Sequence, residues 1–267
     1  MKMQRVGVAN HSHSKNRLNN KGYNMLYANG CSFTYGTGLA HKDKAWPFEL
    51  AEKLGYDRKD TISDAERGVS NQYIVRHTIT AVSELIANGK KPFVAIGLTA
   101  PNRREHFIED KNVLIHNIPS YEYHGNIRLD EQTNTDLALF NTLYMKHFWS
   151  PVYDFHNYLI QVMTLQNFCI TNGLEYVIFN SLNLTPNLVE PTKFMELIDQ
   201  SDMSYVGKQL DMDCIYEDQT FFTYMYDKSM YFPTEGDERY MHPNEEAHSD
   251  WADILFADIE NTRGMKK

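Results

Sequence analysis

Residues 29–36 read Asn-Gly-Cys-Ser-Phe-Thr-Tyr-Gly and come directly after a short apolar run, Met25–Ala28. The run predicts a buried strand, and the glycine-flanked stretch predicts a tight turn where that strand ends. An α/β enzyme can hold a serine nucleophile in such a turn, so Ser32 is a candidate catalytic residue. The turn alone also fits an ordinary strand-to-helix connection in which the serine caps the helix.

Strands and helices alternate along much of the remaining chain. This alternation predicts right-handed crossovers and a mostly parallel sheet between two helical layers. Ligands of such sheets bind beyond the carboxyl ends of the strands, which is where Ser32 falls. The patterns predict strands at Thr61–Ala65, Pro92–Thr99 and Glu175–Leu182, and helices at Pro47–Leu54, Ser70–Asn88, about Leu159–Ile170 and from about Pro243 onward.

Two segments depart from the alternation. Asn102 to about Asp154 separates a strand from the next helix by far more than the usual loop of about two to six residues, and it is rich in aromatic residues. Three interpretations fit it: satellite packing on the sheet, a lid or binding wall beside the active edge, or a subunit interface. Asn183–Arg239 is a second irregular stretch, similarly aromatic and acidic.

Length and charge bound the domain organisation. The chain has 267 residues, of which 42% are hydrophobic, enough for one large domain. The first 24 residues carry five of the 26 basic residues and no acid, so 21 basic residues face 35 acidic ones in the rest. We expect residues 1–24 to be a flexible basic extension and residues 25–267 a single domain with an insertion at about 102–154. So acidic a body argues against general nucleic-acid binding, although the basic arm remains a candidate contact for RNA or a partner.

Several classes of site find no support in the sequence. No apolar run approaches the roughly 18 residues of a membrane span, and the N-terminus lacks the layout of a secretory signal. The three cysteines, Cys31, Cys169 and Cys214, are scattered without metal-ligand spacing. We expect a cytoplasmic protein in a reducing compartment, with no disulfide frame, no metal and no cofactor.

A base for Ser32 is available near the C-terminus. A serine hydroxyl needs an imidazole to take its proton, a third group to orient that imidazole, and donors for the oxyanion. His242-Pro-Asn precedes the last predicted helix, so His242 can reach the same edge of the sheet. The segment by itself also fits a plain helix start, with Asn244 as the cap and Glu245 and Glu246 favouring the helix dipole.

Three segments together resemble the SGNH (GDSL-type) hydrolase superfamily. They are the Ser32 turn, Gly68-Val-Ser-Asn71, and His242-Pro-Asn with His248 and Trp251 following. The likeness is greatest to the intracellular branch, which includes many bacteriophage-encoded members with a Gly-Cys-Ser-Phe-Thr nucleophile segment. It covers residues 25–99 and 157–262, but not the insertion. It implies a flavodoxin-like α/β/α sandwich of about five parallel strands, hydrolysis of esters, thioesters or sugar acetyl groups, no cofactor, and a virion-associated location if the chain is phage-encoded.

The resemblance assigns roles residue by residue. Ser32 matches the nucleophile, and its own N–H matches one oxyanion donor. Gly68 matches a second backbone donor, and Asn71 stands near the start of the long helix, where its side chain could cap that helix. His242 matches the general base.

Two departures from the family pattern bear on activity. The third motif of the family is Gly-x-Asn-Asp, but here Thr99 stands at the Asn position and offers only a hydroxyl. Asn102, Arg103 or Arg104 are candidate substitutes, and a lost oxyanion donor typically costs about 2.7–4 kcal/mol of transition-state stabilisation. The acid normally found three residues before the histidine is Arg239, which leaves Asp237 as the first choice of orienting acid and Glu238 as the second.

The charged residues just after the predicted strand Pro92–Thr99 have two possible roles. The run Arg103-Arg104-Glu105 can grip an anionic group of a substrate, because guanidinium forks suit carboxylate and phosphate, or it can be a solvated, self-neutralising loop start.

We therefore expect a serine esterase or deacylase acting on a small-molecule or glycan acyl substrate, with no nucleic-acid or membrane partner. The alternative is a non-catalytic structural or carbohydrate-binding protein that keeps the SGNH fold. The sequence leaves the acyl substrate and the oligomeric state open.

Overall fold

The structure is a computed structural model that describes residues 22, 24–109, 113–117, 131–183, 208–211, 215–216, 219–233 and 241–265. Residues 1–21 of the expected extension lie outside this described part, and so do Cys214, Asp237, Glu238 and Arg239.

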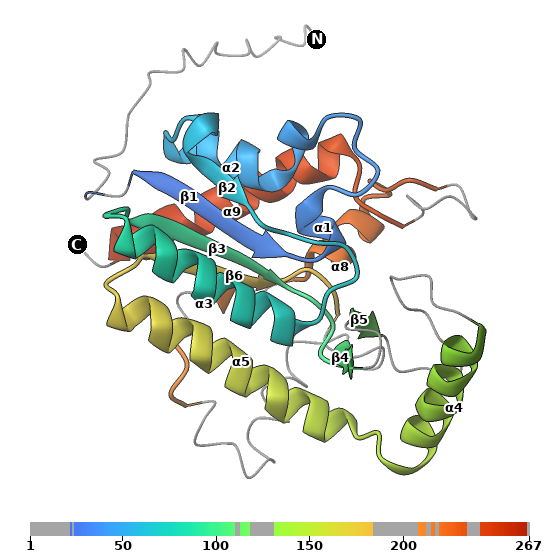
Figure 1. Cartoon of the computed structure of the whole chain (residues 1–267). Coiled ribbons are helices and arrows are strands. Elements are labelled where there is room, and N and C mark those ends of the chain that lie inside the picture. The colour runs from blue at the N-terminus through green and yellow to red at the C-terminus, as the bar shows by residue number, and fades with distance from the viewer. Residues whose placement is uncertain are drawn as a thin grey trace, which may run out of the picture.

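A five-stranded sheet forms the centre of the molecule (Figure 1), in the order β2-β1-β3-β6-β7, and all of its neighbouring strands are parallel. Counted within the sheet, this is the 2-1-3-4-5 order of doubly wound, flavodoxin-like folds, in which the chain reverses direction across the sheet between its first and third strands. The predicted mostly parallel sheet of about five strands is confirmed. The strands are β1 (Met25–Gly30), β2 (Thr61–Ser63), β3 (Pro92–Leu98), β6 (Tyr176–Asn180) and β7 (Ile215–Tyr216).

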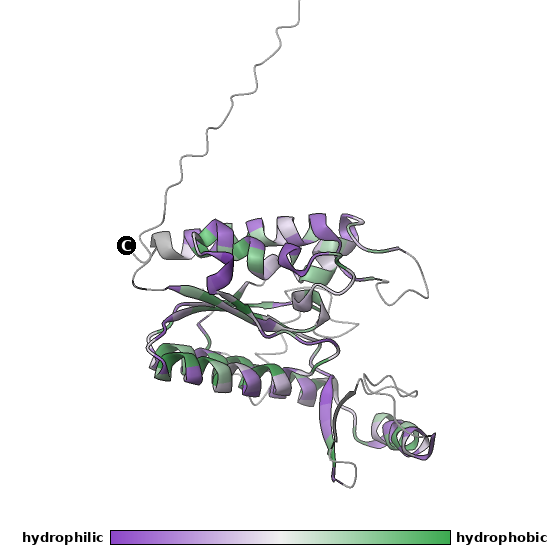
Figure 2. Cartoon of the chain, turned by 45° about the horizontal axis from the view of Figure 1, so that its top comes forward, coloured by the Kyte–Doolittle hydropathy of each residue, from purple (hydrophilic) through white to green (hydrophobic). Residues whose placement is uncertain are grey.

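Helices cover both faces of the sheet. On one face α2 (Trp46–Leu54) packs against α9 (Glu245–Met265), and on the other α3 (Asn71–Ala87) packs against α5 (Pro151–Thr171) (Figures 1 and 2). The three-layer arrangement follows from the buried strands, since apolar side chains alternate to both faces and need cover on each. Shorter helices are α1 (Ser32–Tyr35), α8 (Phe221–Asp227) and single 3₁₀ turns at Lys42–Lys44 and Arg58–Asp60.

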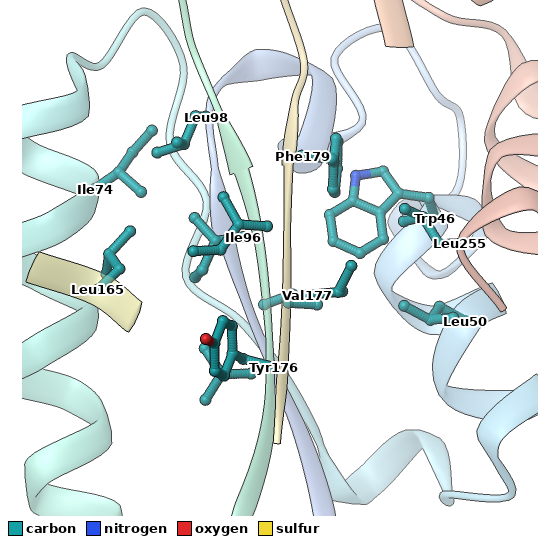
Figure 3. Packing of buried hydrophobic residues seen from close by; sticks show 14 of the residues in the cluster. Trp46, Leu50, Ile74, Ile96, Leu98, Leu165, Tyr176, Val177, Phe179 and Leu255 are labelled. Carbon is teal, nitrogen blue, oxygen red and sulfur yellow. The ribbon is translucent and has the colours of Figure 1, made fainter. Parts of the chain in front are cut away.

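Each strand sends alternate side chains to the two helical layers, as the labelled residues of β3 and β6 show (Figure 3). Ile96 and Leu98 of β3 point toward α3 and α5, whereas Val177 and Phe179 of β6 point toward Trp46 of α2. The ring of Phe179 meets the indole of Trp46 edge-on, with centroids 5.2 Å apart. Full burial of one such side chain stabilises the fold by about 1.5–3 kcal/mol, so this packing fixes the strands that carry the site.

The expected insertion has secondary structure of its own. It holds the antiparallel pair β4 (Arg104–Ile108) and β5 (Val113–Asn117), followed by α4 (Glu131–His147). In both views α4 stands away from the layers around the sheet (Figures 1 and 2). Its exposed apolar side chains include Leu139, Phe140 and Leu143. No helix in the described ranges is both long and apolar enough to cross a membrane.

Candidate active site

Ser32 lies at the start of α1, two residues beyond the carboxyl end of β1. Cys31 occupies the N-cap position, and its carbonyl accepts the N–H groups of Thr34 and Tyr35 at 3.0 and 2.9 Å. The helix ends at Gly36, which has a left-handed φ of 71° that a side chain would strain. Ser32 is 7% exposed, and its hydroxyl makes no hydrogen bond to the residues that the structure describes. The predicted turn therefore exists as a one-turn helix with its serine at the first position.

Two glycines allow this turn to pack closely on the sheet. Gly30 and Gly97 are paired in register across β1 and β3. A Cβ on Gly30 would lie 2.7 Å from the carbonyl oxygen of Gly97, and one on Gly97 would lie 2.6 Å from Ser181 Oγ and 2.8 Å from Thr34 Oγ1. The missing side chains thus set how near α1 comes to the end of β3.

Gly68 is brought to the same end of β1 by the segment after β2. The N–H groups of Asp64 and Glu66 donate to Ala28 and Gly30, at 2.9 and 3.2 Å, and so continue the pairing alongside β1. Gly68 follows with a left-handed φ of 73°. Within the described ranges, no acceptor is found for the backbone N–H of Ser32 or of Gly68. Both N–H groups, which the sequence predicts as oxyanion donors, are therefore available to donate to a substrate oxygen.

Asn71 and Thr99 are joined to each other. Asn71 Nδ2 donates to the carbonyl of Thr99 at 2.9 Å, and Asn71 Oδ1 accepts the N–H of Thr99 at 2.8 Å. The expected capping role of Asn71 is wrong: Ser70 is the N-cap of α3 and accepts from the N–H of Tyr73. The backbone of Thr99 is therefore committed to Asn71, while the Thr99 hydroxyl is buried without a hydrogen-bond partner among the described residues.

His242 lies beside the nucleophile turn. Its ring is centred 5.5 Å from the ring of Phe33, the residue after Ser32. The carbonyl of His242 accepts the N–H of Phe232 at 3.0 Å, and Met241 N–H donates back to Phe232 at 3.1 Å. Met241 has a left-handed φ of 59°, which is uncommon for a residue with a long side chain. The hydrogen bonds to Phe232 and the left-handed backbone of Met241 thus fix the backbone position of His242.

The helix after His242 begins as the sequence predicts. Asn244 Oδ1 accepts the N–H of Ala247 at 2.9 Å, and Glu245 and Glu246 stand in the first turn of α9. The predicted cap is confirmed, and it sets the distance from His242 to the buried face of α9.

His248 is a second histidine near the site, which the sequence presented only as part of a motif. It is fully buried, its Nδ1 accepts the N–H of Trp46 at 3.2 Å, and its Nε2 has no hydrogen-bond partner within the described residues. Burial lowers the pKa of His248 to about 3, and the charges of Lys42 and His242 act in the same direction. His248 is therefore a neutral ring whose proton sits on Nε2 and which joins α9 to α2.

The loop after β3 carries the other candidates. Asn102 lies in the turn between Ala100 and Arg103, and the Arg103 N–H donates to the Ala100 carbonyl at 3.1 Å. Arg104 and Glu105 are engaged elsewhere, in ion pairs with Asp154 and Arg76. In the described part of the chain, no group of three or more His, Cys, Asp or Glu side chains is arranged to hold a metal ion.

Comparison with known proteins gives one family match. The sequence model of a family described as "Family of unknown function (DUF6071)" matches residues 34–257. No curated protein matches the chain.

Solved structures with a similar fold have low sequence identity to this chain. The psychrotrophic esterase EstA from Pseudoalteromonas sp. aligns with 89% of this chain and 97% of its own, at 13% identity and a TM-score of 0.48. A structure named TesA aligns with 89% and 99%, at 14% identity and a TM-score of 0.46. A member of the lipolytic protein G-D-S-L family from Veillonella parvula DSM 2008 aligns with 86% and 96%, at 13% identity and a TM-score of 0.37.

Proposed function

This chain belongs to the DUF6071 family, a family of unknown function, and we propose that it is a serine hydrolase that cleaves an ester-type acyl bond through Ser32 and His242. The observation that supports the proposal is the packing of the His242 ring against Phe33, the residue directly after Ser32. Ser32 follows β1 at the point where the strand order reverses. Ligands of doubly wound sheets bind at this crevice.

The reaction follows from the groups at this edge. The Ser32 hydroxyl attacks the acyl carbonyl as His242 takes its proton, and the oxyanion accepts hydrogen bonds from the N–H groups of Ser32 and Gly68. His242 then gives the proton to the departing alcohol or thiol, which leaves an acyl group on Ser32. Water, deprotonated by His242, releases the acid and restores the serine. Asp237 is the carboxylate we propose as the orienter of His242.

Thr99 stands where the SGNH motif has a third oxyanion donor, the side chain of an asparagine. The N–H of Thr99 is bound to Asn71, so the Thr99 hydroxyl, or the side chains of Asn102 and Arg103, would have to add to the two backbone donors. A missing donor lowers the rate by about 10²–10³. We therefore expect slow turnover of p-nitrophenyl acetate, well below that of an enzyme with three donors.

The test is covalent labelling by a fluorophosphonate together with hydrolysis of p-nitrophenyl acetate. Both should be lost in Ser32→Ala and reduced by at least a hundredfold in His242→Gln. Ser181→Ala, which alters another buried serine at the end of β6, is the matched control and should keep both. Activity that survives Ser32→Ala would overturn the assignment of the nucleophile.

A second candidate function is a non-catalytic binding protein that keeps this fold, with a carbohydrate as the ligand. The observation that favours it is Thr99, which puts a buried hydroxyl in the place where the SGNH motif has the side-chain amide of an asparagine. On this account the wild-type protein is silent to the fluorophosphonate across pH 6–9, while an acetylated oligosaccharide still binds Ser32→Ala.

A further inference from the structure

Arg103 differs from its two charged neighbours in having no partner. Arg104 pairs with Asp154 and lies over the ring of Tyr144, and the carboxylate of Glu105 pairs with Arg76 at 2.9 Å. Arg103 forms no ion pair with any residue in the described ranges, and its Nη1 is buried without a hydrogen-bond partner. Arg104 Nε is also buried without a hydrogen-bond partner, but among the described residues of this run Arg103 is the one that lacks a counter-charge.

An unsatisfied buried guanidinium is costly. The group keeps its charge, and removing a charge from water without a counter-charge is strongly unfavourable. Burial lowers the pKa of Arg103, and the Cys31 side chain nearby opposes that change. An arginine in a turn would ordinarily extend into water. Here the residue is half-buried and its Nη1 is enclosed by the protein without a partner among the described residues, which is expected where a ligand supplies the missing negative charge.

The backbone on either side of Arg103 is anchored. Thr99 is bound twice by Asn71, the N–H of Arg103 donates to the Ala100 carbonyl, and Glu105 N–H donates to Gln72 Oε1 at 3.3 Å. The position of the guanidinium is thus set by the end of β3 and the start of α3. A charge held in this way is preorganised for a ligand.

Arg103 follows the same end of the sheet as the nucleophile turn. Gly97 of β3 lies in register with Gly30 of β1, so the loop that carries Arg103 and the turn that carries Ser32 follow neighbouring ends of two paired strands. The charge of Cys31, the residue before Ser32, also acts on the pKa of Arg103.

Two further cations surround α1. Lys42 Nζ and the Arg67 guanidinium lie 4.3 and 5.2 Å from the centre of the Tyr35 ring, at the end of the helix that Ser32 begins. Both are positive charges in a chain whose net charge is −9, and positive charges near a site favour the approach of anions.

We propose that Arg103 binds an anionic group, a carboxylate or a phosphate, on the acyl substrate that Ser32 attacks. The inference rests on the proposed function and adds the substrate class: esters with a negative charge close to the scissile carbonyl. The planar fork of arginine donates two parallel hydrogen bonds to either anion. A neutral ester leaves the guanidinium unpaired in the complex and is therefore a poor substrate.

Binding tests this inference without requiring catalysis. In a Ser32→Ala background, calorimetry should detect binding of succinate or of inorganic phosphate, and the preferred anion identifies the group. Arg103→Met should weaken that binding at least tenfold, and Arg103→Lys should weaken it less. If neither anion binds, or if Arg103→Met binds them equally well, the inference is wrong.

Hydrolysis separates substrate choice from general catalysis. The wild type should favour p-nitrophenyl hemisuccinate over p-nitrophenyl acetate by tenfold or more in kcat/KM, and Arg103→Met should remove this preference by lowering kcat/KM for the hemisuccinate at least tenfold more than for the acetate. An equal loss on both esters would make Arg103 an oxyanion donor and overturn the anion-binding role. Hydrolysis of acetate without any anion preference leaves the proposed function standing and rejects this inference. Anion binding without hydrolysis does the reverse.

A stability measurement guards against a structural explanation. Without ligand, Arg103→Met should unfold at the same temperature as the wild type or higher, because it removes an unpaired buried charge. Arg104→Met, its matched control, should unfold at a lower temperature, because it leaves Asp154 buried alone. A large drop for Arg103→Met would show that the guanidinium supports the fold, and it would count against the proposal.

Discussion

The side-chain amide of Asn71 binds both polar backbone groups of Thr99, with hydrogen bonds of 2.9 and 2.8 Å. This pair ties the first turn of α3 to the loop that follows β3. The position of the loop that carries Asn102 and Arg103 is therefore set in part by Asn71 of α3.

Asn71→Ala should lower the free energy of unfolding by about 1–3 kcal/mol, because it leaves a buried N–H and a buried carbonyl unpaired. Denaturant unfolding measures this loss. Asn88→Ala is the control, since Asn88 makes an exposed hydrogen bond to Glu84 and should change stability by less than about 1 kcal/mol. Equal effects of the two changes would contradict the role of Asn71.

His248 should make the fold sensitive to acid. Its pKa is lowered to about 3 in the folded protein against an ordinary value of 6.5, so the unfolded chain binds this proton more readily. The contribution is complete above pH 6.5 and is lost as the pH falls toward 3, at about 1.4 kcal/mol per pH unit. Unfolding in urea at several pH values measures the slope. His248→Asn keeps an acceptor for the Trp46 N–H and cannot titrate, so its slope between pH 6 and 4 should be smaller. An unchanged slope would assign the acid sensitivity to other groups.

Gly97→Ala should destabilise the protein by about 1–3 kcal/mol, because its methyl group would meet Ser181 Oγ and Thr34 Oγ1 at 2.6 and 2.8 Å. Labelling of Ser32 should also slow, since α1 must shift. Gly89→Ala is the control for added bulk: it has open space around it and only its φ of 71° to strain it. If Gly97→Ala labels at the wild-type rate, the close packing of α1 on β3 is not needed for reactivity.

Breaking the ion pair of Arg104 and Asp154 should lower the free energy of unfolding more than breaking an exposed pair. Their side chains are 17% and 2% exposed, and Trp149 Nε1–H also donates to Asp154 at 3.1 Å. Arg104→Met should cost about 3–5 kcal/mol by leaving a buried carboxylate unpaired. Arg58→Met, which removes the exposed partner of Asp43, should cost less than about 1 kcal/mol. Thermal unfolding of the two variants measures both losses, and equal losses would contradict the greater contribution of the buried pair.

The elements predicted from sequence are those with a strong local pattern. α3, β3 and β6 combine a clear period or a continuous apolar run with flanking turn residues, and each lies within two residues of its predicted bounds. β7 was not predicted, because two residues cannot display a period of two. The hairpin of β4 and β5 and the helix α4 were also missed, since that segment was interpreted only as a long insertion.

For the site, the sequence predicts which segments meet better than it predicts how they bind one another. The Ser32 turn, Gly68 and the His242 segment are local motifs. The bond between Asn71 and Thr99 joins residues far apart in the chain, and the bond between His248 and Trp46 spans most of it. The local sequence around Asn71, at the start of a predicted helix, suggests a helix cap. It gives no sign of the bond to Thr99. Whether Arg103 has a counter-charge depends on burial, which its neighbours in sequence do not reveal.

The packing of α9 on α2 has a consequence for how the protein is made. Translation releases α2 early and α9 late, so the α2 face of the sheet is covered only in part until α9 is made. The helix that completes the cover begins three residues after His242. A ribosome-bound chain stalled before Glu245 should therefore be cut readily by protease and stay silent to a fluorophosphonate, whereas release of α9 should end both conditions together. A newborn molecule would thus gain its proposed base at the step that completes the cover on the α2 face of the sheet.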